Sequence, residues 1–190
     1  MDTHLKLLPT NGVELTDPSS FRRLIGRQLY LTVTRPNITY SVNYLSQFLQ
    51  NPKSAHKDAA QRILRFLKGT FGHEIFLSSS NSPSFHGNTD SDWAGCPITR
   101  RSTTGYFVTL GNSPISWKSK KQTTVDRSSA ETDYSALENL TPELQCGLIL
   151  PKHLSSSDQL ADVFTKPLGA SQFGRLVGKL GVRSGSTAPT

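Results

Sequence analysis

The hydrophobic pattern of the chain changes its period at one serine-rich stretch, residues 78–84, which reads SSSNSPS. Before this stretch, apolar residues recur every three to four positions, the spacing that places them on one face of a helix. After it, short runs of β-branched and aromatic residues stand between Gly, Asn and Pro, as is typical of strands. The change predicts an α+β chain with a helical module over residues 1–77, a mixed module over residues 78–182, and a disordered tail over residues 183–190.

The first module contains three expected amphipathic helices. Asp17 as N-cap and Pro18 at the first helical position begin the first helix. The second begins at Pro36, and the third is expected to have Ser54 as its cap and to end at Gly69. Three short helices of this kind form a small bundle around one core. The residues expected to line that core are Phe21, Leu24, Ile25, Leu29, Ile38, Val42, Leu45, Leu49, Ala59, Ala60, Ile63, Leu64 and Leu67.

The second module mixes strands and helices. The sequence predicts an extended segment ending at Asp90, and then strands over 105–110 and 115–119 that are joined by the turn Gly-Asn-Ser-Pro. A helix is expected from near Ser128, and a short strand over 147–150. Two further helical segments, DQLADVFTKPL and SQFGRLVGKLGV, follow. We therefore expect a small mixed sheet packed with helices.

Charge is unevenly distributed along the chain, whose formal net charge is +7. Residues 1–80 hold ten Lys and Arg against five acids, residues 81–150 hold six against seven, and residues 151–190 hold five against two. A carboxylate-rich middle between basic flanks suits a protein that binds a polyanion and also holds a metal. Surface charge that serves only solubility gives the same distribution, so both interpretations stay open.

Several classes of protein are disfavoured by the sequence. No apolar run approaches the roughly 18 residues of a membrane helix, and the N-terminus lacks the features of a secretory signal. The two cysteines, Cys96 and Cys146, have no CxxC spacing, which argues against a zinc site and a disulfide framework. We expect a cytoplasmic or nuclear protein that is not secreted and does not contact a membrane.

Five segments stand in order along the chain: YLTVTRPNITYSVNYLSQF, RILRFLKGT, TDSDWAGCPITRRSTTGYF, ISWKSKKQTTVDRSSAETDYSAL and QLADVFTKPLG. Together they resemble the C-terminal end of copia-type (Ty1/copia) LTR retrotransposon polyproteins, from about Met1 to Val182. The resemblance implies that residues 1–77 are the thumb-like end of a reverse transcriptase and that residues 78–182 are a ribonuclease H domain. The upstream polymerase segment has no counterpart here, so DNA synthesis by this chain alone is not expected.

The resemblance also implies a reaction, the hydrolysis of RNA in RNA–DNA hybrids with Mg²⁺ or Mn²⁺. Such ions are held by carboxylates that converge from separate elements. Asp90 matches the ligand that the family carries on its first strand, and Asp162 matches the ligand near the C-terminus. Asp92 is interpreted as a turn or support residue.

The ligand on the helix is ambiguous. The family usually reads SSAEAEY at this position, whereas this chain reads SSAETDY. Glu131 is retained, but with Ser128 it also fits a capping box, in which the Glu side chain accepts from a backbone N–H. Asp133 takes the place of the second Glu and is one methylene shorter, which suits octahedral Mg²⁺ geometry poorly. Both acids remain catalytic candidates, and Glu131 is the metal-ligand candidate beside Asp90 and Asp162.

A further family carboxylate has no counterpart in this sequence. The family carries it on a strand that ends in Cys-Asp-Asn, but here TPELQ passes straight into CGLILPKHL. An internal deletion joined near Leu144–Gln145 explains this, and it predicts absent or weak nuclease activity and doubtful metal binding. Residues 147–150 are then expected to pair in parallel with the strand that leads to Asp90, because an unpaired strand edge is costly.

Nucleic acid is the expected partner, as an RNA–DNA hybrid or in another form, and an intact copy of the polyprotein is a second one. The phosphate-binding candidates are Arg22, Arg23, Arg27, Lys57, Arg65 and Lys68. Two alternatives from other classes are a nucleic-acid-binding remnant and an inert translated relic without a selected role.

Overall fold

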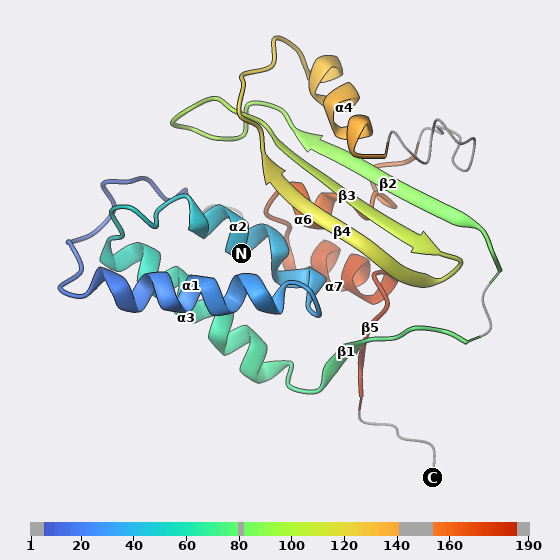
Figure 1. Ribbon diagram of the computed structural model, residues 1–190, viewed down its shortest axis with the longest axis horizontal. Helices are drawn as coiled ribbons and strands as arrows, with labels where there is room; N and C mark the ends of the chain where they lie inside the picture. The colour runs from blue at the N-terminus through green and yellow to red at the C-terminus, as the bar shows by residue number, and fades with distance from the viewer. Residues whose placement is uncertain (1–5, 80–81, 141–153, 186–190) are drawn as a thin grey trace.

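The computed structural model describes residues 6–79, 82–140 and 154–185. Its helices are α1 (Pro18–Leu31), α2 (Thr39–Ser46), α3 (Ser54–Gly69), α4 (Ser129–Leu137), α6 (Asp162–Thr165) and α7 (Ala170–Lys179), with 3₁₀ turns at Pro36–Ile38 and Glu138–Leu140. Its strands are β1 (His73–Ile75), β2 (Phe85–Asp92), β3 (Thr103–Leu110), β4 (Ser113–Lys121) and β5 (Val182–Ser184). The chain has the predicted α+β composition, and α1–α3 lie beside the sheet (Figure 1).

The three predicted helices of the first module are present. Asp17 Oδ1 accepts hydrogen bonds from Ser19 N at 2.9 Å and Ser20 N at 3.2 Å, so Asp17 caps α1 as expected. The prediction that Ser54 caps α3 was wrong. Ser54 is instead the first residue of the helix. Its Oγ accepts a hydrogen bond from Val13 N at 3.2 Å, so it binds the N-terminal segment and not the N–H groups of α3.

We expect the Asp17→Ala variant to lose about 1 kcal/mol of unfolding free energy, since two N–H groups of α1 lose their acceptor. Urea denaturation followed by circular dichroism measures this loss. The exposed Asp58→Ala, inside α3, is the matched control and should stay within about 0.5 kcal/mol of the parent chain. Equal losses in the two variants would contradict the capping role.

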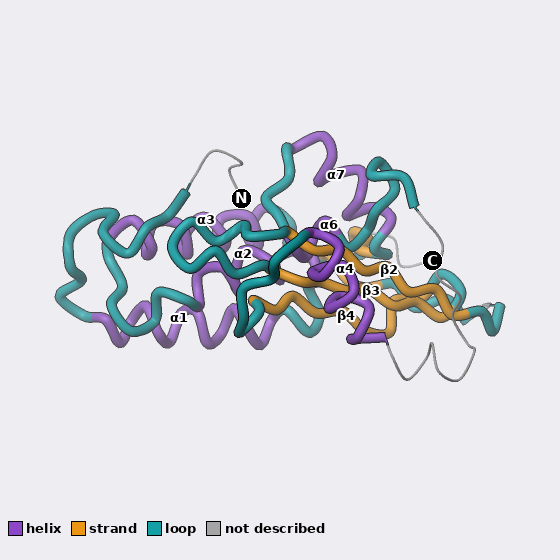
Figure 2. Tube along the Cα trace, turned by 90° about the horizontal axis from the view of Figure 1, so that it is seen from above, coloured by secondary structure: helices purple, strands orange, loops and turns teal. Residues whose placement is uncertain are grey.

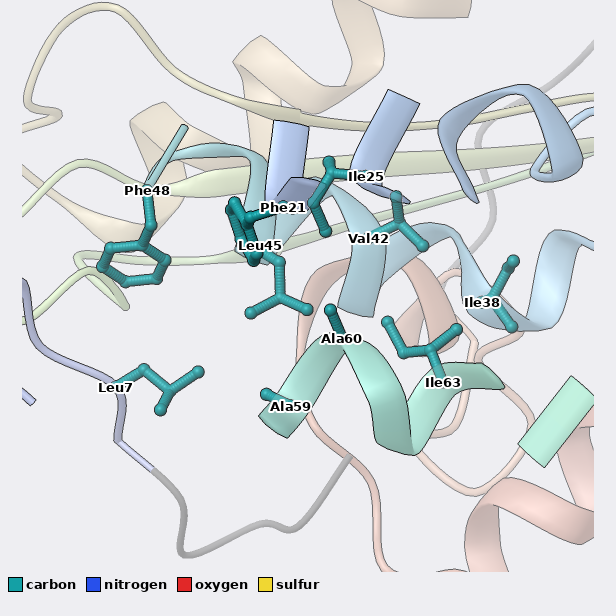
Figure 3. Close-up of a cluster of buried hydrophobic side chains, with 10 residues drawn as sticks. All are labelled: Leu7, Phe21, Ile25, Ile38, Val42, Leu45, Phe48, Ala59, Ala60 and Ile63. Carbon is teal, nitrogen blue, oxygen red and sulfur yellow. The ribbon is translucent and has the colours of Figure 1, made fainter. Parts of the chain in front are cut away.

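One apolar core holds the three helices together (Figure 3). Its buried members are Leu7, Phe21, Ile25, Ile38, Val42, Leu45, Phe48, Ala59, Ala60 and Ile63. Two residues predicted to line it, Leu29 and Leu64, are instead exposed. Both lie at the margin of their helical stripe, where so small a bundle has no further helix to cover them.

The second module is built on an antiparallel sheet in the order β2–β3–β4. The β3 and β4 strands are longer than predicted because the hairpin turn is shorter. Leu110 pairs with Ser113, which leaves only two residues in the turn, and Gly111 adopts a φ of 56° there. A positive φ is cheap only for glycine and suits the twist of a two-residue hairpin.

The two faces of this sheet are covered by different helices. Figure 1 shows α4 on one side of the sheet and α6 with α7 on the other. The second face carries a separate buried core made of Phe107, Val163, Phe164, Leu168, Leu176, Leu180 and Val182. Phe107 and Phe164 stack at 5.9 Å between ring centroids, which fixes α6 against β3.

The helical module and the sheet are joined by several polar contacts. Asn43 Nδ2 donates to Ser119 O at 3.0 Å, and Trp117 Nε1 donates to Thr32 O at 2.8 Å. Figure 2 shows α1, α2 and α3 toward one end and the sheet, with α4, α6 and α7, toward the other. These contacts cross the predicted boundary at residue 77.

The strand pair β1–β5 also crosses that boundary, since it joins residues 73–75 to residues 182–184 in antiparallel register. The predicted disordered tail from residue 183 was therefore wrong at its start, because Arg183 and Ser184 belong to β5 and pair with β1. Residues 186–190 and the predicted strand over 147–150 lie outside the described residues. Within the described ranges, no helix has the length and apolarity needed to cross a bilayer.

Candidate functional site

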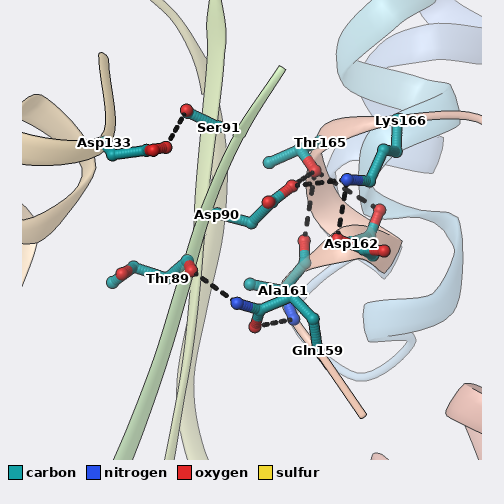
Figure 4. A network of polar contacts seen from close by, with 9 residues as sticks. All are labelled: Thr89, Asp90, Ser91, Asp133, Gln159, Ala161, Asp162, Thr165 and Lys166. Carbon is teal, nitrogen blue, oxygen red and sulfur yellow. Dashed lines mark hydrogen bonds and ion pairs between the residues drawn. The ribbon is translucent and has the colours of Figure 1, made fainter. Parts of the chain in front are cut away.

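The candidate site lies near the C-terminal end of β2, where consecutive side chains point to opposite faces of the sheet. Asp90 faces α6 and accepts a hydrogen bond from Thr165 Oγ1. Ser91 faces α4 and donates to Asp133 Oδ1. The sheet therefore stands between the surroundings of Asp90 and those of Asp133 (Figure 4).

Two carboxylates meet a single ammonium group on the α6 side. Lys166 Nζ lies 3.3 Å from Asp90 Oδ2 and 2.8 Å from Asp162 Oδ1. The Asp162 side chain is only 5% exposed and that of Asp90 16%, so both acids are largely removed from water. Figure 4 shows Lys166 and Thr165 directed at the same carboxylate of Asp90.

The close approach of α6 to the sheet depends on Gly105 of β3. A Cβ at this position would lie 2.7 Å from Phe164 Cβ and 2.9 Å from Thr165 Cγ2. On the edge of β2, Gln159 Nε2 donates to Thr89 O at 2.9 Å. These contacts hold the start of α6, and with it Asp162, against the strand that carries Asp90.

The electrostatics of the cluster follow from two acids sharing one cation. Burial raises the pKa of Asp162, and the neighbouring carboxylate of Asp90 adds to that rise, against the pull of Lys166. For Lys166, burial lowers the pKa, but the hydrogen bond to Asp162 and the two negative charges outweigh it, and the net pKa is raised. Lys166 is therefore charged, and the three groups carry a net charge of −1 when both acids are ionised.

The two candidate acids of α4 are placed elsewhere. Glu131 Oε2 accepts from Arg127 N at 2.7 Å, while Ser128 Oγ accepts from Glu131 N at 3.2 Å. Glu131 thus closes the N-terminus of its own helix, close to the capping box expected from the sequence. Asp133 is held by Ser91 on the α4 face of the sheet. The structure brings Asp90 and Asp162 together and leaves Glu131 and Asp133 apart from them.

This arrangement does not fit a two-metal site. Within the residues that the structure describes, no three His, Cys, Asp or Glu side chains gather closely enough to hold a metal ion. Mg²⁺ requires a nearly octahedral set of oxygen ligands, whereas here two carboxylates already surround an ammonium.

The six predicted phosphate-binding residues lie on α1 and α3, and they are not equally available. Arg22 Nε donates to Leu49 O at 2.9 Å, and Arg23 lies 3.6 Å from Asp17. Lys57 is half-buried. The other three, Arg27, Arg65 and Lys68, are exposed on the helical module.

Sequence reasoning missed Thr165 and Lys166. A lysine four residues after Asp162 on a helix is a recognisable ion-pair signal, so Lys166 could have been found. The contacts of Thr165 and Lys166 with Asp90 could not, because they join residues 75 or more positions apart through tertiary packing.

Comparison with known proteins gives consistent results. The chain is 37% identical to a retrovirus-related Pol polyprotein from transposon RE1 of Arabidopsis thaliana, over 93% of the chain and 16% of that protein. It is 36% identical to the RE2 polyprotein of the same plant, over 96% of the chain and 16% of that protein. A Nicotiana tabacum polyprotein from transposon TNT 1-94 is 37% identical over 73% of the chain and 11% of its own length.

The chain belongs to the copia-type retrotransposon Pol polyproteins. It spans only 16% of the length of the two Arabidopsis polyproteins. No family model and no solved structure matches it.

The matches to these Pol polyproteins also bear on the predicted deletion. The match to the RE1 polyprotein extends over 231 aligned positions, although the whole chain has 190 residues. The relative therefore carries at least 41 positions, inside the matched region, that have no counterpart here. This length difference agrees with the internal deletion predicted from the sequence, whose place near Leu144–Gln145 stays a prediction.

Proposed function

We propose that this fragment derives from the reverse transcriptase thumb and ribonuclease H region of a Pol polyprotein and hydrolyses RNA–DNA hybrids weakly or not at all. One observation carries the proposal: Lys166 Nζ stands 3.3 Å and 2.8 Å from the only two candidate carboxylates that come together. Ribonuclease H chemistry uses divalent cations to activate water and stabilise the leaving oxygen, and it needs converging carboxylates to hold them. In this chain, Asp90 and Asp162 serve an ion pair instead.

A cleavage assay tests this proposal. The purified chain is incubated with a fluorescent RNA–DNA hybrid in Mg²⁺ or Mn²⁺, beside the variant Asp90→Asn. We expect the parent chain to release product at or only slightly above the level of Asp90→Asn. Robust cleavage by the parent chain that requires the metal and disappears in Asp90→Asn would overturn the proposal.

A second candidate function is sequence-independent binding of nucleic acid. It is supported by the charge of residues 1–80, where ten basic residues face five acids, and by the exposure of Arg27, Arg65 and Lys68. Exposed cations bind phosphates mainly by releasing counterions, so such binding depends strongly on salt.

We expect a hybrid duplex to bind with a Kd of about 10⁻⁴ to 10⁻⁶ M. If Arg27, Arg65 and Lys68 each contact a phosphate, affinity should fall roughly 40-fold between about 50 and about 200 mM salt. Fluorescence anisotropy measures both values.

Reversing these three charges to Glu should abolish the salt dependence, whereas the matched reversal of Arg100, Arg101 and Lys118 on the sheet module should retain most of it. Binding without salt dependence would exclude phosphate contact, and a chain that neither binds nor cleaves would be an inert relic.

A further inference from the structure

A second cluster of reactive side chains lies away from the carboxylates, where α2 meets the sheet. Lys121 at the end of β4 directs Nζ to Cys96 Sγ at 2.8 Å and to Gln47 Oε1 at 3.1 Å. Cys96 belongs to the loop between β2 and β3 and is only 6% exposed. The contact therefore joins three elements that are distant in the sequence.

The loop around Cys96 is held in place by its backbone. Cys96 N donates to Arg101 O at 3.3 Å, and Arg100 N donates to Cys96 O at 2.9 Å. These bonds close the loop on itself and hold the Cys96 backbone in place. In this arrangement Cys96 Sγ lies beside Lys121 Nζ.

The group that can balance the positive charge of Lys121 is the Cys96 thiol, which lies 2.8 Å from its Nζ. In the described residues, no carboxylate lies within ion-pair distance of its Nζ, since the ion pairs there involve Arg23, Lys53, Lys166 and Lys179. Gln47 offers only a neutral oxygen. An ammonium that is partly removed from water and faces a thiol favours the thiolate, because the pair then neutralises itself.

A small cavity of about 100 Å³ opens onto this pair. Its wall includes Tyr40, Tyr44, Asp92, Cys96, Ser119 and Lys121. A water molecule takes about 30 Å³ of liquid volume, so the space admits a few molecules of that size. Cys96 is only 6% exposed, and the cavity gives small oxidants a path to its side chain.

We infer that Cys96 is a thiolate nucleophile paired with the Lys121 ammonium, and that it is a site of oxidation by small peroxides. The sulfur attacks one oxygen of hydrogen peroxide, so that an S–O bond forms as the O–O bond breaks. Cys96 becomes a sulfenic acid and hydroxide leaves. Sulfur loses two electrons, and the peroxide gains them.

Burial raises the pKa of the Cys96 thiol, but hydrogen bonds from Lys121, Thr99 and the backbone at Ile98 outweigh this rise and bring the pKa down to about 7. The other titratable groups that face the cavity are Asp92 on β2 and Tyr40 and Tyr44 on α2. Burial raises the pKa of both tyrosines, with further contributions from the Asp92 charge at Tyr40 and the Cys96 charge at Tyr44. Near neutral pH the two tyrosines are therefore uncharged.

The test measures the oxidation rate of Cys96 in the full chain. Samples treated with hydrogen peroxide are quenched into denaturant with dimedone, and the adduct on the peptide that carries Cys96 is quantified by mass spectrometry. The pH midpoint of the rate should lie near 7. In Lys121→Gln it should move toward about 8.5, the ordinary value for a thiol. The rate at neutral pH should then fall about threefold, since the lost thiolate is partly offset by higher intrinsic nucleophilicity.

Two variants make the result specific to the pair. Lys121→Arg keeps the positive charge and should retain a low midpoint, which a purely structural role for Lys121 would not require. Lys120→Gln removes the same charge from the opposite face of β4 and should leave the midpoint unchanged. Circular dichroism verifies the fold of each variant. A Cys96 that resists peroxide in the folded chain, or an unchanged midpoint in folded Lys121→Gln, would overturn the inference.

Discussion

The Phe164→Ala variant should lose about 3–5 kcal/mol of unfolding free energy, the largest effect that we expect from a single substitution in this chain. Phe164 is fully buried and stacks on Phe107, with 5.9 Å between their ring centroids and 17° between their planes. Its removal leaves a cavity between α6 and β3, where Gly105 already permits close approach. Because α6 carries Asp162, the carboxylate site should lose its geometry with the packing. Urea denaturation followed by tryptophan fluorescence measures the loss.

Phe71 provides the matched control, since it is the same residue type at 92% exposure. Phe71→Ala should change stability by less than about 0.5 kcal/mol. Phe164→Leu should recover part of the loss, because it restores apolar volume. Similar losses at the two phenylalanines would mean that α6 does not pack on the sheet as described.

The second large effect is expected at His56, which is fully buried in the helical module. Its Nδ1 accepts from Lys53 N at 3.0 Å, and its Nε2 donates to Leu8 O at 3.0 Å. The ring also stacks on Phe48 at 3.9 Å. His56→Ala should cost roughly 2–4 kcal/mol, because it leaves a cavity and two unpaired backbone groups.

His56 should also make stability depend on pH. Burial lowers its pKa, with a further contribution from the Lys53 charge, against the hydrogen bond to Leu8 O. The unfolded chain therefore takes up a proton as pH falls through about 6.5, while the folded chain remains neutral until lower pH. Stability is present above that pH and is lost below it, by at most about 1.4 kcal/mol per pH unit.

Unfolding free energies of the parent chain and of His56→Gln, measured from pH 7 to pH 5, test this dependence. The variant has no group that titrates at this position, so its slope over the range should be smaller. The same slope in both proteins would assign the pH dependence to other groups.

Local signals allowed the elements to be predicted from the sequence. Asp17 followed by Pro18 marks the start of α1, and the alternating runs on either side of Gly111 mark the β3–β4 hairpin. Ser54 was misassigned as a cap because a capping residue is inferred from its neighbours in sequence. In the fold, the Ser54 hydroxyl oxygen accepts a hydrogen bond from the backbone N–H of Val13, 41 residues earlier.

The carboxylate site could be predicted only in part. Asp90 and Asp162 were identified from motifs, and the fold brings them to the same ammonium. The separation of Asp133 from this pair follows from the pleat of β2, which sends Asp90 and Ser91 to opposite faces. Which face a helix covers depends on tertiary packing, and no local spacing within SSAETDY encodes it.

The central claim is that Asp90 and Asp162 form an ion pair with Lys166 instead of holding divalent cations, and counting bound Mn²⁺ tests it most directly. Electron paramagnetic resonance of free Mn²⁺, titrated with the purified chain, gives the number of ions bound without any need for nuclease activity. We predict no saturable site, and no difference between the parent chain and Asp90→Asn or Asp162→Asn. Saturable binding of two ions per chain that both substitutions abolish would contradict the claim.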